Sequence, residues 1–157
     1  MAALTRARRA ALVAALILPL ALIGCVAPAN PSTVTVTFDV DGSERSVTLR
    51  PDVTCAETGV HGSSIGETGP GGQFSFLDRS LNGTLGTGSG AIEDGPGLIL
   101  FDAAEIELVP ADGVVDVAET AVTVLVFADR AESGPEFDDA DGEEVDGILT
   151  AHLVCTE

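Results

Sequence analysis

Histidine and serine residues are the first candidates for catalysis in this chain. His61 is followed closely by Ser63 and Ser64, a grouping that suggests a serine nucleophile with its general base. A working triad is normally assembled from distant parts of a chain, and the sequence lacks the Gly-x-Ser-x-Gly elbow of the hydrolases. The Gly-Pro-Gly-Gly stretch at 69–72 has no following Lys, so it is not a phosphate loop. We interpret His61 as a loop residue and predict neither enzymatic activity nor a cofactor.

An acidic segment offers oxygen ligands for a hard cation. Residues 129–146 hold nine acids and one base, and part of the segment resembles a calcium loop. With Gly142 at the sixth position of an EF-hand, Phe137 and Ile148 occupy positions that need acids. We therefore interpret the segment as a solvated loop between two strands. A weak calcium site remains an alternative, with the ligands Asp139, Asp141, Glu143 and Asp146.

The charge and composition of the chain exclude several classes of partner. Its 157 residues carry 7 Arg and no Lys against 25 acids, a formal charge of −18. Such a chain cannot neutralise a phosphate backbone, so nucleic acid is excluded as a main partner. Trp and Tyr are absent, which argues against sites that stack sugars or bases. A hydrophobic fraction of 45% indicates a folded protein, and the length fits one domain.

The N-terminus has the organisation of an export signal. Three arginines precede an uncharged run, residues 10–24, that is shorter than the roughly 20 residues a membrane-spanning helix needs. The run ends in Leu22-Ile23-Gly24-Cys25, which resembles the lipobox of bacterial lipoprotein signals. That resemblance implies a helical signal peptide over 1–24, cleaved before Cys25, and a diacylglycerol on the Cys25 thiol. A plain signal peptide is the alternative.

The predicted processing defines where the protein resides. Residues 25–32 become the lipidated cysteine and a short tether, followed by a β domain over 33–157. Cleavage removes three Arg and no acid, which leaves 4 Arg against 25 acids on the mature chain. This charge repels anionic headgroups, so we expect the domain to stand off the surface. The predicted location is the outer face of the cell membrane, held by lipid; two or more acyl chains give stable anchoring.

Two further cysteines remain, Cys55 and Cys155, both at apolar positions of strand-like segments. The exported compartment permits disulfides, so we predict one disulfide between them. The alternative is a Cys-His nucleophile using His61 or His152. Alternation places His152 on the opposite face of its strand from Cys155, and no residue that would orient His61 is evident.

Alternating apolar and polar residues predict an all-β domain. Strand patterns cover 33–40 and 44–49, joined by Asp41-Gly42, a strong hairpin signal. The glycine-rich segment 59–97 predicts mostly turns, with one or two strands. Further strand patterns follow at these ranges: 98–101, 104–108, 114–117, 121–127 and 148–155. Many short strands between turns favour an antiparallel sandwich or an open barrel.

The order of these features resembles the 19 kDa lipoprotein antigen family of mycobacteria and related actinobacteria. The resemblance rests on the lipobox cysteine, the Asp-Gly hairpin, the strand ending Val53-Thr54-Cys55, the glycine-rich middle and the C-terminal Leu153-Val154-Cys155. It implies a small disulfide-linked β domain, attached to the envelope by lipid, with no established enzymatic activity. This chain departs from the family in its short tether and its stronger acidity.

Two functional hypotheses follow. The first is a lipid-anchored envelope lipoprotein of the surface-antigen type, with a non-catalytic structural or interaction role. The second is an envelope binding module that carries an apolar ligand between its sheets, which a domain of this size could enclose. The expected partners are the membrane, through the lipid, and an envelope component or apolar ligand.

Overall fold

The computed structural model describes residues 31–66, 69–79, 85–129 and 142–156. Within these ranges the chain forms β-strands and no helix. The strands are β1 (Thr33–Val40), β2 (Ser43–Leu49), β3 (Asp52–Ala56), β4 (Gly59–Ile65), β5 (Gly71–Asp78), β6 (Leu85–Asp94), β7 (Gly97–Ala111), β8 (Val114–Phe127) and β9 (Glu143–Val154).

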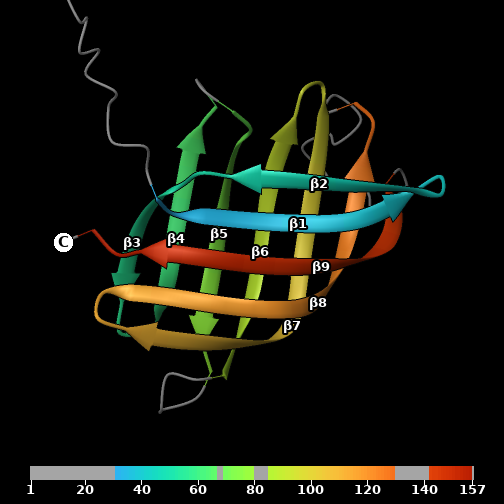
Figure 1. Cartoon of the computed structure of the whole chain (residues 1–157). Coiled ribbons are helices and arrows are strands. Elements are labelled where there is room, and N and C mark those ends of the chain that lie inside the picture. Colours follow the sequence, from blue (N-terminus) through green and yellow to red (C-terminus); the bar gives the residue numbers. More distant parts are fainter. Residues whose placement is uncertain (1–30, 67–68, 80–84, 130–141, 157) are drawn as a thin grey trace, which may run out of the picture.

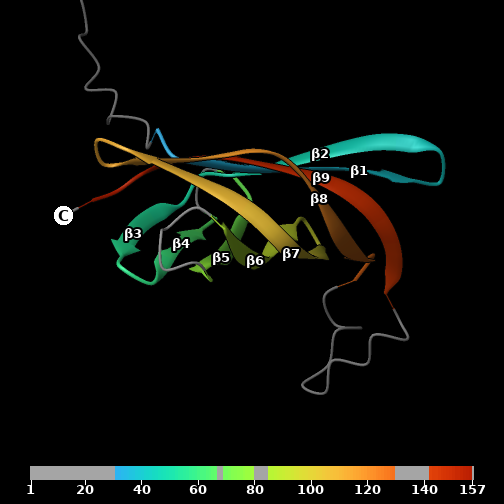
Figure 2. The same cartoon turned by 90° about the horizontal axis from the view of Figure 1, so that it is seen from below.

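The strands form one antiparallel sheet in the order β2-β1-β9-β8-β7-β6-β5-β4-β3. The sheet curls into a half-barrel, so its two ends lie face to face as two layers (Figures 1 and 2). One layer contains β1, β2 and β9, and the other contains β3 to β6. The long strands β7 and β8 bend and contribute to both layers. The predicted all-β antiparallel fold is confirmed.

Irregular pairing accompanies the bends between the layers. The register shifts between Gly86 and Gly88, where β6 pairs with β7, and between Val117 and Thr120, where β8 pairs with β9. Such bulges bend a strand and allow it to pass from one layer to the other. One curled sheet can therefore enclose a core on its own.

Both edges of the sheet are held by contacts. The Cys55–Cys155 disulfide ties the β3 edge to the end of β9, and the two cysteines are 100 positions apart in the sequence. Beside it, Thr156 donates its backbone N–H to Val53 O at 3.3 Å. At the other edge, Arg45 of β2 forms an ion pair with Asp94 of β6. An open sheet edge is a template for unwanted pairing, which these links restrict.

The core lies between the layers and combines aliphatic side chains with phenylalanine. Three phenylalanine rings occupy space that glycines of neighbouring strands leave open. The pairs are Phe74 with Gly62, Phe76 with Gly88, and Phe101 with Gly90; a Cβ at these glycines would lie 2.3, 2.7 and 2.4 Å from the ring carbons. The rings of Phe74 and Phe76 also contact each other, with centroids 4.7 Å apart. A glycine opposite a large ring preserves close packing without strain.

The nine strands, the buried core and the disulfide all lie between residues 31 and 156. A unit that contains its own core can fold without the rest of its chain. The predicted helical signal peptide and the lipidated Cys25 lie outside the described residues.

The structure corrects four expectations about elements. The glycine-rich segment holds three strands, β4, β5 and β6, where one or two were expected. The ranges 98–101 and 104–108 belong to one strand, β7, and 114–117 and 121–127 to another, β8. The last strand starts at Glu143 instead of Ile148, so the end of the predicted acidic loop is strand. His61 lies within β4 and not in a loop.

Candidate functional site

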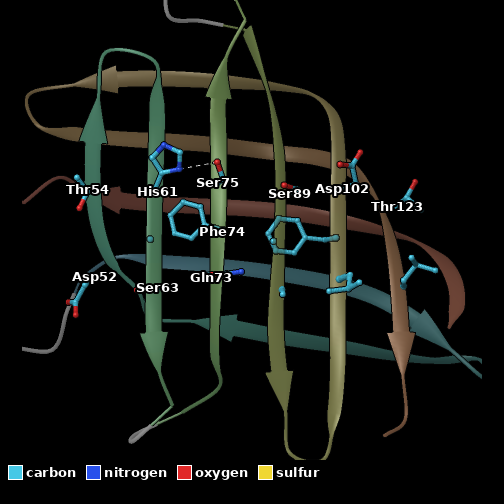
Figure 3. Close-up of a pocket in the computed structure, with 16 residues that line it drawn as sticks. Asp52, Thr54, His61, Ser63, Gln73, Phe74, Ser75, Ser89, Asp102 and Thr123 are labelled. Carbon is cyan, nitrogen blue, oxygen red and sulfur yellow. Dashed lines mark hydrogen bonds between the residues drawn. The ribbon is translucent and has the colours of Figure 1, made fainter. Parts of the chain in front are cut away.

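A hollow of about 810 Å³ opens on the outer face of the sheet, away from the core. Its 16 lining residues come from the six adjacent strands β3 to β8. Figure 3 looks onto this face, with the other layer of the sheet behind it. The cross-strand registers explain which residues line it, because they align three successive rows of residues across the six strands.

The first row is polar in all six strands. Direct cross-strand pairing runs from Thr54 to His61, then to Ser75, Ser89, Asp102 and Thr123. Figure 3 shows these side chains in a line across the strands. Directly paired residues on one face lie about 5 Å apart, so this row presents hydroxyl, imidazole and carboxylate groups at short, regular intervals.

The second row lies on the same face, two residues from the first on each strand. It changes character across the sheet: polar residues on β3 to β5 are followed by apolar residues on β6 to β8. In strand order these residues are Asp52, Ser63, Gln73, Ala91, Leu100 and Leu125. Ala91, Leu100 and Leu125 are each half-buried. On β3 to β5, both walls of the hollow are therefore polar. On β6 to β8, one wall is polar and the other is apolar.

Between these rows runs a third, whose side chains face the core. It contributes Gly62, Phe74, Gly90 and Phe101 to the lining. Phe74 and Phe101 are only 4% and 2% exposed, since their rings pack between the layers. The backbone of this row thus forms the floor of the hollow, and the two outward-facing rows form its walls.

His61 and Ser75 share a hydrogen bond on the polar wall. The distance between His61 Nδ1 and Ser75 Oγ is 2.9 Å. In the described part of the chain His61 has no second partner that would orient its ring, and a serine protease-like triad needs one. The sequence suggested Ser63 or Ser64 as the partner; alternation places Ser64 on the opposite face, and cross-strand pairing brings Ser75 to the imidazole instead.

The charge of the lining is one-sided. Two carboxylates, Asp52 and Asp102, belong to it, and neither Arg nor Lys does. Asp102 is exposed and lies between Ser89 and Thr123 in the polar row. Within the described residues its carboxylate has no hydrogen-bond or ion-pair partner. The hollow therefore suits neutral or positively charged groups better than anions.

The predicted disulfide is present, and it excludes the Cys-His nucleophile. The Cα atoms of Cys55 and Cys155 are 5.5 Å apart, and the sulfur atoms are bonded, so neither thiol is free. His152 instead pairs with Asp116 of β8, with 2.7 Å between Nδ1 and Oδ1. Both side chains of this pair are about half exposed, at 49% and 55%. A pair so accessible to water contributes little to stability.

The four proposed calcium ligands are only partly within the described chain. Asp139 and Asp141 lie outside it. Glu143 and Asp146 lie on β9, whose continuous pairing with β8 places residues three apart on opposite faces. No group of three or more metal-ligating side chains occurs among the residues that the structure describes. The calcium site stays a prediction.

Several residues of the hollow were not expected from the sequence, notably Ser75, Ser89 and Asp102. Their signal is the spacing of two between outward residues: polar residues at 61 and 63 and at 73 and 75, and a polar residue with an apolar one at 89 and 91 and at 100 and 102. The strands β4 to β6 that carry much of this pattern are rich in glycine, which hides it. The row itself depends on register, which no single strand reveals.

The described residues contain no helix with the length and hydropathy to span a membrane. Comparison of the chain with protein-family models, with curated proteins and with solved structures gives no match in any of the three.

Proposed function

We propose that this protein is a lipid-anchored, non-catalytic binding protein of the cell envelope, and that the hollow on β3 to β8 is its binding site. The observation that carries the proposal is the hollow itself. Six strands in register present two walls of outward side chains over a backbone floor, with a volume of about 810 Å³. Ligand sites in proteins are concave and combine apolar surface with a few placed polar groups.

The composition of the hollow favours binding over catalysis. Its only hydrogen-bonded pair of nucleophile and base type is His61 with Ser75, within the part of the chain that the structure describes. This histidine lacks an orienting carboxylate, and an outward-facing strand surface offers no set of backbone N–H groups for an oxyanion, because the ladder uses them. The hydroxyl and amide side chains of the walls suit hydrogen bonding to a bound ligand that does not react.

The envelope location is supported by the sequence of residues 1–25 and by the resemblance to the 19 kDa lipoprotein antigen family. The body of the domain carries a large negative charge, which favours a position off an anionic surface. The second hypothesis placed a ligand between the sheets. That space holds buried rings such as Phe76, at 0% exposure, so the outer hollow is the better candidate site.

Lipid anchoring is tested by Cys25→Ser in the native host. We expect the wild-type protein to partition into the membrane fraction and to incorporate labelled palmitate. The variant should incorporate no label, because serine cannot form the thioether. Cys55→Ala is the matched control, since it also removes one cysteine but leaves the lipobox intact. Recovery of labelled C25S protein would contradict the assignment of Cys25.

The binding function is tested by native mass spectrometry of the protein extracted from the envelope in which it was made. We expect a bound small molecule on the wild-type protein. Ser89→Tyr should abolish it, because the new ring fills the centre of the polar row. Thr48→Tyr places the same ring on the outer face of the other layer and should retain the ligand. If repeated preparations of the wild type show only the unliganded mass, the binding role is contradicted. If S89Y retains as much ligand as the wild type, the ligand binds outside the hollow.

A further inference from the structure

The half of the hollow on β6 to β8 presents a carboxylate, without a partner among the described residues, beside an apolar strip, and we propose that it binds an aliphatic ammonium group. The ligand class is a primary amine on an alkyl chain, with the ammonium at Asp102 and the chain over Leu100 and Leu125. This inference rests on the proposed function, because it names the ligand chemistry of the same hollow.

Asp102 is the anchor for the cation. Its exposed carboxylate accepts hydrogen bonds only, and an ammonium donates three. Ser89 and Thr123 flank it directly across the two neighbouring strands. Their hydroxyl oxygens are further acceptors at the spacing of adjacent strands, about 4.8 Å. One carboxylate between two hydroxyls matches a compact cation with several donors.

The apolar strip lies one row away, on the same three strands. Leu100 is two residues before Asp102 on β7, so both side chains point outward from the same strand. Leu100 pairs directly with Ala91 on β6 and with Leu125 on β8. An alkyl chain that extends from the ammonium across the floor reaches this strip within about 7 Å, the distance of two strand residues. All three side chains retain exposed surface that such a chain would cover.

The negative charge of the chain also favours a cationic ligand over an anionic one. The lining contains no Arg or Lys, and the whole chain carries 25 acids against 7 Arg. A negative potential raises the local concentration of cations and lowers that of anions. An anionic amphiphile with the same chain would meet Asp102 without a compensating cation in the lining.

The experiment compares three probes that share an eight-carbon chain: n-octylammonium, 1-octanol and n-octanoate. Residues 26–157, with the disulfide formed, are titrated with each probe below its aggregation range and followed by amide chemical shifts. We expect octylammonium to shift the amides around Asp102 and Leu125 and to bind about threefold to fivefold more tightly than octanol, the scale of an exposed ion pair. Octanoate should bind more weakly than octanol. Ethylammonium should bind at least tenfold more weakly than octylammonium, because it leaves the strip uncovered.

Asp102→Asn is the test variant and Asp112→Asn the matched control. Asp112 lies in the turn between β7 and β8, outside the hollow, and its substitution makes the same change in net charge. We expect D102N to bind octylammonium and octanol equally and D112N to retain the wild-type preference. The melting temperatures of both should match the wild type.

Three results overturn the inference: octanol or octanoate binds as tightly as octylammonium, D102N retains the preference for the amine, or no probe shifts the amides of the hollow. These outcomes are separate from the failure of the proposed function. A neutral or anionic molecule that is retained by the wild type and lost by S89Y in mass spectrometry upholds the binding site and rejects the amine.

Discussion

Replacing both Cys55 and Cys155 with alanine should lower the free energy of unfolding by about 4 to 5 kcal/mol. The disulfide closes a loop of 100 residues. On the chain-entropy model, closing a loop of this length lowers the conformational entropy of the unfolded chain and so raises its free energy by about that amount. A loss of this size is a large part of the stability of an ordinary domain. Urea unfolding of C55A/C155A and wild-type protein, followed by circular dichroism, gives the difference directly.

Reduction of the wild-type protein is the control for this prediction. A reductant should bring the wild type to the stability of C55A/C155A and leave the variant unchanged. If the variant loses less than about 1 kcal/mol, the entropic account is wrong for this fold. The ladder contacts beside the bridge, such as Thr156 with Val53, would then hold the β3 edge without it.

Phe76→Ala should cost about 3 to 5 kcal/mol. Phe76 is 0% exposed and is among the largest fully buried side chains, so its removal leaves a cavity as well as losing apolar contacts. Its ring packs on Phe74 and over Gly88, where the neighbouring strand has no side chain to move into the space. Ile65→Ala is the surface control, because Ile65 is 90% exposed, and it should change stability by less than about 0.5 kcal/mol.

A double-mutant cycle tests the ring-over-glycine contact itself. Gly88→Ala alone should destabilise the protein by about 1 to 3 kcal/mol, since the new Cβ would lie 2.7 Å from a carbon of the Phe76 ring. With Phe76→Leu in place the same alanine should cost less than it does in the wild type. Additive effects would show that the two residues do not compete for the same space.

Strands with strong alternation could be predicted from the sequence, and the glycine-rich ones could not. Along most of β1 and in the second half of β9 every second residue is apolar and buried, so Val34, Val36, Leu149 and Leu153 are found in the core as the pattern indicates. In β4 and β6 the corresponding core positions hold Gly62, Gly88 and Gly90. A glycine has no side chain to mark which face it occupies, and here the phenylalanine that fills its place comes from another strand. The period of two is therefore broken in the sequence but intact in the structure.

The candidate site could not be predicted from the sequence for a related reason. The disulfide could be predicted, because it needs only two cysteines and an oxidising compartment. The hollow depends on the registers of five strand pairings, which together bring Thr54 and Thr123 into one row although 69 positions separate them. A shift of one residue in any pairing would turn that strand's polar residues into the core. Single-strand patterns carry no such information.

The position of the disulfide also determines how the domain would respond to mechanical force. With the proposed lipid anchor, a pull from the membrane would enter through Ser32 at the start of β1. This strand is hydrogen-bonded on both sides, to β2 and to β9. Ser32 lies beside Val154, where β1 begins and β9 ends, so tension between the chain ends would peel β1 away from β9 one residue pair at a time. If β1 and β2 did give way, tension between the chain ends would pass from Cys55 to Cys155 through the sulfur atoms. Residues 56–154, which include most of the hollow, would carry none of it.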